Sequence, residues 1–474
     1  AGGTDAASAL QNSIDYSKKA AKNGAIVTLS THMPNFTNAK IKKNADGTYD
    51  FYNCDFNEAK DLSGDSLKKI LPGGEKNEVF KAYLDTIAFY ANALEKENIP
   101  VIFRPFHEDT GGWFWWGSAN TAESYRSLYA YTRDYLESKG VHNMLYVYSP
   151  NGPLETEAEY MSRYPGDAYV DILAFDYYND FNTYPAESDT SFFDHLDQTC
   201  QVVSSLAKQH NKLAAISETG VRVMKKDGSD NEGLLVKNNP VSEAKSGVNW
   251  YQKVNDIAKE NDMPYYMVWA NFSDTNFYVP YKYSDTMGQE MINDFISYYN
   301  NEDSVFGNGT NFYGNIDKYA GVKTDNYKDV SGYMVAPFDM DTILKPTVLK
   351  ASVSNAGEVS FVVKDTAKGK QLTLPAAKGS DGFYTAQLTQ KEMDQIGKTD
   401  VASITLVADG KELSTITNLS IGKEKDKAPA GVLENFDYYV GSNGLLDAAY
   451  GGNSAAGCSS SFTLDQEHKA DGTY

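Results

Sequence analysis

The sequence predicts an α/β protein in which a (β/α)₈ barrel is followed by a small Ig-like β-sandwich. Three observations carry this prediction. Short apolar runs alternate with amphipathic segments of helix length up to about residue 300, polar or aromatic residues follow nearly every apolar run, and strict alternation begins after residue 345. Strands that alternate with helices form parallel sheets with right-handed crossovers. Polar residues at many strand ends favour a barrel, because an open sheet concentrates its site at one switch point.

Six apolar runs are predicted to be barrel strands, because each is short and follows a turn or a helix end. They are residues 24–30, 100–103, 144–148, 170–175, 213–216 and 265–268. Apolar residues at helical spacing predict helices at 5–22, 77–98, 122–138, 191–209, 242–260 and 287–299. A closed barrel needs eight strands. Either two are hidden in the loop-rich residues 33–75, or the sequence begins inside the domain.

The later residues predict smaller parts. We assign residues 1–344 to the barrel and an irregular extension rich in Gly, Asn and Asp. Alternating apolar residues with regularly spaced turns predict the Ig-like β-sandwich over 345–421. Residues 422–431 are charged and contain Pro and Gly, as a linker does. The turn-rich residues 432–474 are too few for an independent β domain, so we expect the first part of a truncated module.

The composition argues against several classes of protein. A formal net charge of −21 without a basic stripe argues against a nucleic-acid partner. No apolar run is long enough to predict a membrane span. The cysteines, Cys54, Cys200 and Cys458, lack metal-ligand spacing and the six histidines include no HExxH, so we expect no metal. No signal peptide is visible at Ala1, and an exported protein would already have lost it.

The most informative stretch is VIFRPFHEDTGGWFWWG, residues 101–117. Its apolar strand ends at Arg104, and Glu108 follows among three tryptophans. Surroundings of low polarity raise the pKa of a carboxylic acid, as a general acid working near neutral pH requires. Flat indole faces also suit the C–H faces of pyranose rings. The alternative is a tryptophan cluster in a core, which we favour for any single Trp but not for the whole string, so the stretch predicts a sugar site.

A second glutamate, Glu218, stands at the end of another predicted strand, 218 − 108 = 110 residues after Glu108. Glycoside hydrolysis uses two carboxyl groups, about 5–5.5 Å apart for retention or about 6.5–9.5 Å apart for inversion. The sequence does not supply that distance. Polar and aromatic residues at or near strand ends are further candidates for substrate contact: Arg104, Trp116 and Asp176. A lone histidine is often structural, so His32, which follows the first predicted strand, is an open candidate.

RPFHEDTGGWFWWG at 104–117 and ISETG at 216–220 resemble the two catalytic motifs of glycoside hydrolase family 26, whose members include endo-β-1,4-mannanases. The resemblance extends from about Gly24 to about Tyr299. It implies a (β/α)₈ TIM barrel of a retaining clan, with the two glutamates after strands four and seven and no cofactor. It also implies that strands one and two are missing, which would explain the count of six strands as truncation.

The resemblance also implies the role of individual residues. Glu108 matches the acid/base and Glu218 the nucleophile. Further matches are His107, which precedes the acid/base, Trp113 at the cleaved bond, Tyr178 on the nucleophile, Trp269 under the sugar at subsite −1, and His32 as a substrate contact. Two places depart from the pattern. Asp109-Thr110 replaces an apolar residue or Met and then Asn or Ser, and Ala270 stands where some mannanases have an arginine, which bears on subsite preference.

The sequence therefore predicts a secreted or cell-surface, monomeric, retaining endo-β-1,4-mannanase that acts on mannan, glucomannan or galactomannan. A β-1,3-1,4-glucanase (lichenase) or a β-1,3-xylanase of the same family is the first alternative. A non-catalytic polysaccharide-binding protein built on a barrel is the second, and the presence of both glutamates argues against it. The residues from Val432 resemble the opening of a mannan-binding carbohydrate-binding module.

Overall fold

The computed structural model describes residues 3–37, 41–52, 54, 66–181, 190–224, 231–232, 235–237, 249–271, 278–284, 287–289, 291–307 and 327–425. Two compact units share the chain. The first contains residues 1–32, 86–111 and 140–321, and the second contains residues 33–85, 112–139 and 322–474. Cys458, the predicted truncated module and most of the predicted linker lie outside the described residues.

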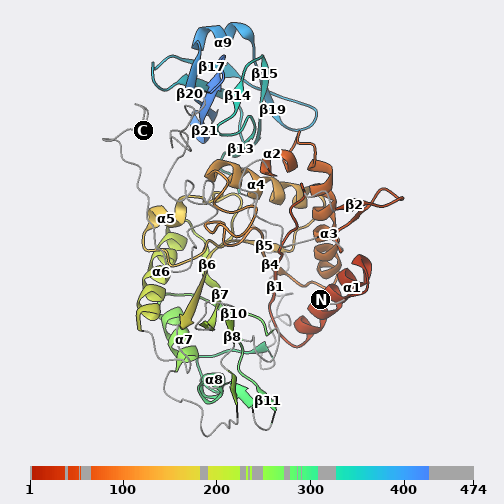
Figure 1. The fold of residues 1–474 in the computed structure, drawn as a ribbon, viewed down its shortest axis with the longest axis vertical. Coiled ribbons are helices and arrows are strands. Elements are labelled where there is room, and N and C mark those ends of the chain that lie inside the picture. The colour runs from red at the N-terminus through yellow and green to blue at the C-terminus, as the bar shows by residue number, and fades with distance from the viewer. Residues whose placement is uncertain are drawn as a thin grey trace, which may run out of the picture. The chain divides into compact units, whose positions relative to one another are not determined.

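A parallel sheet forms the centre of the first unit (Figure 1), and its strand order β1-β4-β5-β6-β7-β10 follows the sequence. The strands are β1 (Val27–Ser30), β4 (Val101–Arg104), β5 (Met144–Tyr148), β6 (Ile172–Phe181), β7 (Leu213–Met224) and β10 (Tyr266–Val268). Every neighbouring pair is parallel. Each strand corresponds to a predicted one. Strict sequential order is that of a (β/α) barrel, whereas a doubly wound sheet would reverse it.

Helices precede, connect and follow these strands. They are α1 (Ala6–Lys22), α5 (Glu157–Met161), α6 (Thr190–Gln209), α7 (Trp250–Glu260) and α8 (Ile292–Tyr299), and α3 (Asn77–Glu95) enters the first unit at Thr86. The helix predicted at 287–299 begins only at Ile292. The reason is that β12 (Met287–Gln289) pairs with β9 (Leu235–Lys237) and β11 (Lys282–Ser284), while a two-residue β8 (Asn231–Glu232) pairs with β7. α5 was not predicted, because five residues are too few to show a period.

One face of the parallel sheet carries an apolar layer. Its buried members are Val147, Ile172, Ala174 and Ala215, with Ile102 and Tyr265 partly buried against them. Residues paired across neighbouring parallel strands share a face of the sheet, and so do alternate residues along one strand. This layer therefore identifies which polar residues, further along the same strands, share that face.

The second unit contains two larger β-sheets. One has the order β13-β15-β19-β18, and the other β14-β21-β20-β16-β17. Their strands are β13 (Ser331–Ala336), β14 (Thr342–Ile343), β15 (Thr347–Ser354), β16 (Val359–Asp365), β17 (Gln371–Pro375), β18 (Ala377–Lys378), β19 (Tyr384–Leu388), β20 (Thr399–Ala408) and β21 (Lys411–Ile421). A short helix, α9 (Gln390–Ile396), joins β19 to β20. All pairs are antiparallel except β14 with β21.

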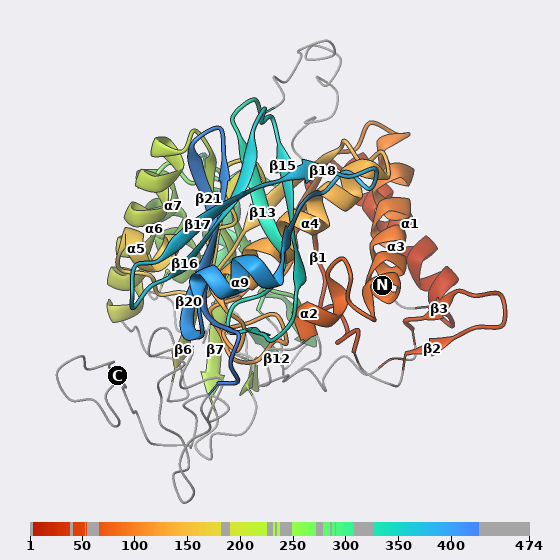
Figure 2. The same ribbon diagram turned by 90° about the horizontal axis from the view of Figure 1, so that it is seen from above.

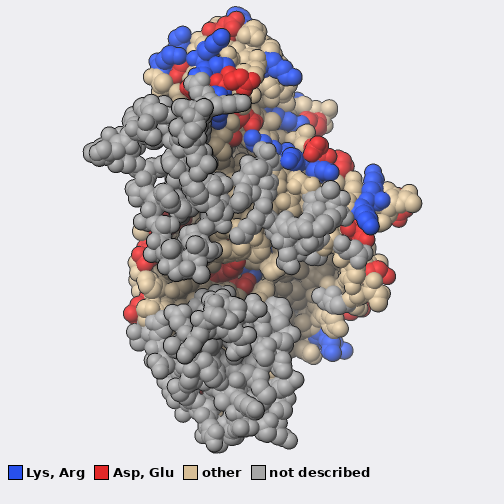
Figure 3. All heavy atoms as spheres, in the orientation of Figure 1, with Lys and Arg blue, Asp and Glu red and all other residues tan. Residues whose placement is uncertain are grey.

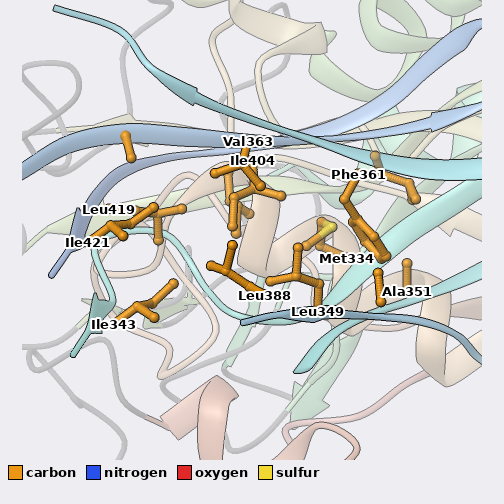
Figure 4. Close-up of a cluster of buried hydrophobic side chains, with 14 of the residues drawn as sticks. Met334, Ile343, Leu349, Ala351, Phe361, Val363, Leu388, Ile404, Leu419 and Ile421 are labelled. Atoms are coloured by element: carbon orange, nitrogen blue, oxygen red, sulfur yellow. The ribbon is translucent and has the colours of Figure 1, made fainter. Parts of the chain in front are cut away.

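These two sheets pack face to face on one hydrophobic core (Figure 4). Leu349 and Leu388 come from one sheet, and Phe361, Ile404 and Leu419 come from the other. Buried and less buried residues alternate along β15 and β16, as the sequence predicted for a sandwich. On the face shown in Figure 3, basic and acidic side chains are interspersed over these sheets.

Two strands of these sheets, β13 and β14, precede the predicted start at residue 345 and lie within a stretch that was expected to be irregular. Tyr333, Met334 and Val335 of β13 are all buried, so both faces of this strand are covered and its sequence shows no alternation. β14 has only two residues, too few for a pattern. The boundary between residues 344 and 345 stays a prediction.

The helix α4 (Ala122–Ser138) packs beside β13 in the second unit (Figure 2). The Oγ of Ser127 donates to the backbone oxygen of Met334 at 2.8 Å. Asp134 accepts from the hydroxyl of Tyr333 at 3.1 Å and from that of Ser352 at 3.4 Å. This unit also holds α2 (Ser66–Ile70) and a hairpin of β2 (Lys42–Lys43) and β3 (Tyr49–Asp50). Among the described residues, none of the helices combines the length and the hydrophobicity that a membrane span requires.

Asp134 is expected to make the stability of this unit depend on pH. Burial raises its pKa from 3.8 to about 6, against the hydrogen bond from Tyr333. Between about pH 4 and about pH 6, the folded state therefore holds a proton that the unfolded state has lost. The contribution of Asp134 to the free energy of unfolding is fully present below pH 4 and is lost as the pH rises through 6. The full difference corresponds to at most about 3 kcal/mol, and partial solvent access reduces it.

Denaturant unfolding at pH 4.5, 5.5 and 7 tests this expectation. Asp134→Asn should flatten the fall in unfolding free energy over this range, because the amide does not titrate. Asp85→Asn, which removes a carboxylate that accepts from Tyr135, is the matched control and should keep the wild-type slope. Equal slopes in the wild type and Asp134→Asn would contradict the assignment.

Candidate functional site

A polar layer follows the apolar layer on the same face of the parallel sheet. Arg104, Ser149 and Asp176 each stand two positions after a residue of that layer. Arg104 is the last residue of β4, Ser149 directly follows β5, and Asp176 lies within β6. All three are almost completely buried. The carboxyl ends of barrel strands are where the active sites of such folds lie, so this layer is the candidate site.

A bulge in β7 brings Glu218 into this layer. Phe175 lies opposite Ile216, but the next pair is Asp176 with Glu218, so β7 contains one extra residue, Ser217. A bulge sets two residues opposite one and redirects their side chains. The Oγ of Ser217 donates to Oδ1 of Asp176 at 2.7 Å and to the backbone oxygen of Phe175 at 3.1 Å. Both Ser217 and Glu218 therefore lie next to Asp176.

Arg104 bridges the two carboxylates. Its Nη1 donates to Oδ2 of Asp176 and its Nη2 donates to Oε2 of Glu218. Burial would lower the pKa of Arg104, but the carboxylates of Asp176, Glu218 and Glu108 outweigh burial and raise this pKa. Burial raises the pKa of Asp176 well above its usual value, although Arg104 opposes the shift. The guanidinium therefore stays charged and fixes one oxygen of each carboxylate, as its planar fork allows.

Two serines complete the surroundings of Asp176, and neither was predicted. The Oγ of Ser149 donates to Oδ1 of Asp176 at 2.8 Å and lies 2.7 Å from the Oγ of Ser217. The backbone oxygen of Ser149 accepts from the amide of Glu108 at 2.7 Å. Their place directly after apolar runs is the signal that could have identified them, since Ser149 follows the run 144–148 and Ser217 follows the run 213–216.

Tyr178 holds the other oxygen of Glu218. Its hydroxyl donates to Oε1 of Glu218. Burial raises the pKa of Tyr178 strongly, and Glu218 raises it further, so this hydroxyl remains a donor. A Cβ added at Gly220 would lie 2.5 Å from the ring of Tyr278, which packs edge-on against Tyr178 at 5.8 Å. The sequence ETG therefore needs its glycine so that these rings can approach the strand.

Glu108 has an unusual backbone conformation, with φ at +54°. A residue other than glycine in this left-handed region costs about 1–2 kcal/mol, and such strain gathers at functional sites. Glu108 is partly exposed, whereas Glu218 is only 5% exposed and Asp176 is fully buried. One carboxylate oxygen of each of the three lies within 4.8 Å of the others. The structure therefore brings together both predicted glutamates.

These three carboxylates form the acidic group that, within the described ranges, comes closest to a metal site. Two of them already share the guanidinium of Arg104. A cation placed among them would be repelled by this buried positive charge. This arrangement therefore suits a pair of catalytic carboxyl groups better than it suits a metal ion. The described cysteines, Cys54 and Cys200, are buried, and neither forms a disulfide.

Three more predicted residues lie together in the first unit. The rings of His32 and His107 are stacked with their centroids 5.2 Å apart, and Trp269 lies 6.4 Å from His32. Burial lowers the pKa of His32, although Glu218 opposes this. Burial also lowers the pKa of His107 well below its usual value, and Arg104 adds to the shift. Both imidazoles are therefore neutral near pH 7 and can donate and accept hydrogen bonds.

The tryptophans after the glycine pair belong to the second unit and differ from one another. Trp116 is completely buried and stacks on Phe114, with ring centroids 4.3 Å apart. Trp115 is also buried and donates to the backbone oxygen of Met33 at 3.0 Å. The burial of Trp116 argues against its predicted substrate contact, because its ring offers no free face. Trp113 is 44% exposed, so its ring surface is accessible.

Known proteins resemble this chain in sequence. The model of glycosyl hydrolase family 26 matches residues 3–278. A mannan endo-1,4-β-mannosidase of Bifidobacterium adolescentis is 27% identical over 459 residues, which cover 90% of this chain and 40% of that protein. Another, of Bacillus subtilis, is 32% identical over 168 residues, or 33% of this chain and 41% of that protein. The chain thus spans about two fifths of the length of these two relatives.

A solved structure supports the same grouping. The modular endo-β-1,4-mannanase of Cellulomonas fimi superimposes with a TM-score of 0.63 at 26% identity, over 86% of this chain and 80% of that one. Since the family match ends at residue 278, a likeness over 86% of the chain extends into the later β-rich part. The predicted fold class, a (β/α) barrel followed by β-sheets, is confirmed.

Proposed function

Because the chain belongs to glycoside hydrolase family 26, we propose that it is a retaining endo-β-1,4-mannanase that cleaves mannan, glucomannan or galactomannan with two glutamates. The relatives named mannan endo-1,4-β-mannosidase support this substrate. In the first unit, the ring of Trp269 beside two neutral histidines is suited to the apolar face and hydroxyls of a sugar. In the second unit, the exposed indole of Trp113 is suited to an apolar sugar face. A polysaccharide is too large to enter a cell, so we propose that the protein acts outside the cell or at its surface. We also propose that it acts as a monomer.

The observation that carries the mechanism is the distance between the carboxylates. Oxygens of Glu108 and Glu218 lie within 4.8 Å of each other. Retaining enzymes separate the two groups by about 5–5.5 Å, whereas inverting enzymes leave about 6.5–9.5 Å for a water molecule between the carboxylate and the sugar. The short separation supports a direct attack on the sugar by one of the carboxylates.

In the first step, Glu218 attacks C1 of the sugar, and the bond from C1 to the leaving oxygen breaks. Arg104 and Tyr178 each hold one oxygen of Glu218, so its carboxylate enters the reaction already oriented. Glu108 gives its proton to the leaving oxygen, and the shortened chain departs. A glycosyl ester on Glu218 remains.

In the second step, the carboxylate of Glu108 takes a proton from a water molecule, and the water oxygen attacks C1. The ester bond breaks, and Glu218 is released as a carboxylate. Two displacements at C1 restore its original configuration. The partial exposure of Glu108 suits a group that must meet both the leaving oxygen and water, and the burial of Glu218 suits a group that bonds to the sugar.

Glu108→Ala with added azide tests the role of the acid/base. On mannan, kcat/KM is expected to fall by about 10²–10⁴-fold, because the leaving oxygen is no longer protonated. On an aryl β-mannobioside with a good leaving group, azide should restore turnover and yield the β-mannobiosyl azide, because a small anion replaces the activated water. Formation of the α-azide, or a lack of rescue together with wild-type activity on mannan, would contradict the retaining mechanism.

A panel of mannan, glucomannan, lichenan and β-1,3-xylan tests the substrate. The wild type should release reducing sugars from mannan and glucomannan. Release from lichenan or β-1,3-xylan alone would favour the glucanase or xylanase alternative. Binding to mannan without any release would indicate a polysaccharide-binding protein.

A further inference from the structure

A buried ion pair anchors the residue that follows Glu108. Nε of Arg163 donates to Oδ2 of Asp109 at 2.8 Å. Asp109 is fully buried and Arg163 is 9% exposed. We propose that Asp109 and Arg163 are positioning residues that hold Glu108 where it can protonate the leaving oxygen. This inference rests on the proposed function.

Arg163 compensates the charge of the buried Asp109 carboxylate. The other oxygen of Asp109, Oδ1, is buried without a hydrogen-bond partner among the described residues. Burial raises the pKa of Asp109 to about 6, and Arg163 opposes the shift. An isolated buried carboxylate is costly unless it is paired. The position of the Asp109 side chain is therefore coupled to that of Arg163.

The neighbours of Asp109 are anchored to the same part of the chain. The amide of Glu108 donates to the backbone oxygen of Ser149 at 2.7 Å. The hydroxyl of Thr110 accepts from the amide of Asn151 at 3.0 Å. Ser149, Asn151 and Arg163 all lie between β5 and β6. Residues 108–110 are thus all bound to the segment that connects β5 to β6. Glu108 binds it through its backbone, Asp109 through an ion pair and Thr110 through its hydroxyl.

The conformation of Glu108 explains why such anchoring matters. Its φ of +54° is unfavourable for a residue with a side chain and persists only where the surroundings hold it. Successive side chains point in different directions, so Asp109 can be buried while Glu108 faces the other carboxylates. If the ion pair were lost, the backbone at Glu108 could relax toward negative φ and move its carboxyl group. A displacement of about 1 Å at a reacting group can cost about 100-fold in rate.

The leaving group separates a positioning role from a structural one. Dinitrophenolate leaves a 2,4-dinitrophenyl β-mannobioside without a proton, whereas the sugar that leaves mannopentaose departs only when its oxygen is protonated. The ratio kcat/KM reports the steps up to the first bond cleavage, so it measures proton donation for mannopentaose and not for the aryl substrate. Displacement of Glu108 therefore lowers the value for mannopentaose and spares that for the aryl substrate, whereas a general structural loss lowers both.

Asp109→Asn and Arg163→Met are the primary variants. We expect kcat/KM on mannopentaose to fall about 10- to 100-fold, while that on the dinitrophenyl substrate changes less than about threefold. Arg163→Lys, which keeps the charge, should restore part of the loss. The double variant Asp109→Asn/Arg163→Gln leaves neither charge of the pair without its partner. If the single variants do not fold, this variant should show the same selective loss of kcat/KM on mannopentaose.

The matched control is Asp167→Asn. Asp167 accepts from the hydroxyl of Tyr164 at 2.9 Å and contacts His210 at 2.8 Å, so it also binds the segment that follows α5. This variant should keep the wild-type ratio between the two substrates. If the Asp109 variants lose kcat/KM equally on both substrates, or on neither, the inference is overturned. In that case the activity of the wild type still upholds the proposed function. A wild type that cleaves neither substrate would overturn both.

Discussion

Replacing Glu218 with Ala is expected to lower kcat on mannan by about 10⁶-fold, which is the size of the loss when a covalent nucleophile is removed from an enzyme. Asp176, the buried carboxylate beside it, is not placed to take over its role. Asp176 is fully buried, its Oδ1 receives two serine hydroxyls, and its Oδ2 receives Arg104. Reducing-sugar release from mannan measures the loss.

Glu260→Ala, which removes an exposed glutamate at the end of α7, is the control and should behave as the wild type. Glu218→Ala should still unfold cooperatively, so that its inactivity is not the result of misfolding. Its activity should also not be rescued on the aryl substrate with retention of configuration. Near wild-type turnover of mannan by Glu218→Ala would end the assignment of this residue as the nucleophile.

Replacing Arg104 with Met is expected to have the largest effect on stability, lowering the unfolding free energy at pH 7 by about 3–5 kcal/mol. The methionine fills much of the volume, but Asp176 and Glu218 lose the cation that both of them share. Two neighbouring buried carboxylates would then lack a compensating charge. Chemical denaturation followed by tryptophan fluorescence measures the change.

The effect should depend on pH. Burial already raises the pKa of Asp176, and the loss of Arg104 removes the main opposing influence, so this pKa rises further. The folded variant then holds a proton at a pH where the unfolded chain does not, and this stability is lost as the pH rises through the folded pKa. The deficit of Arg104→Met should therefore be smaller at pH 4.5 than at pH 7. A constant deficit would contradict this explanation.

Arg133→Met is the matched control, because Arg133 pairs with Glu137 at 3.4 Å on the surface of α4. Exposed pairs contribute about 0–1 kcal/mol, so this change should be small at both pH values. Arg104→Lys should lie between the two variants, since one ammonium cannot donate two parallel bonds to two separate carboxylates as the guanidinium does.

The sequence by itself determined the order of the barrel strands and the two glutamates. Each of the six predicted strands lies in one parallel sheet, because a short apolar run between turns is a local pattern that the fold does not override. Glu108 and Glu218 were identified because each follows such a run. Polar residues after strands of a barrel converge at one end, so local order was sufficient to predict that the two would meet.

Features that depend on contacts across the chain were decided only by the tertiary structure. The extra residue at Ser217 appears only when β7 is paired with β6, and it is this bulge that brings Glu218 level with Asp176. Trp113 and Trp116 stand three residues apart in one motif, yet one is exposed and the other is buried against Phe114. The ion pair of Asp109 joins residues 54 positions apart. Registers, burial and long-range ion pairs are properties of packed neighbours, and a linear pattern does not contain them.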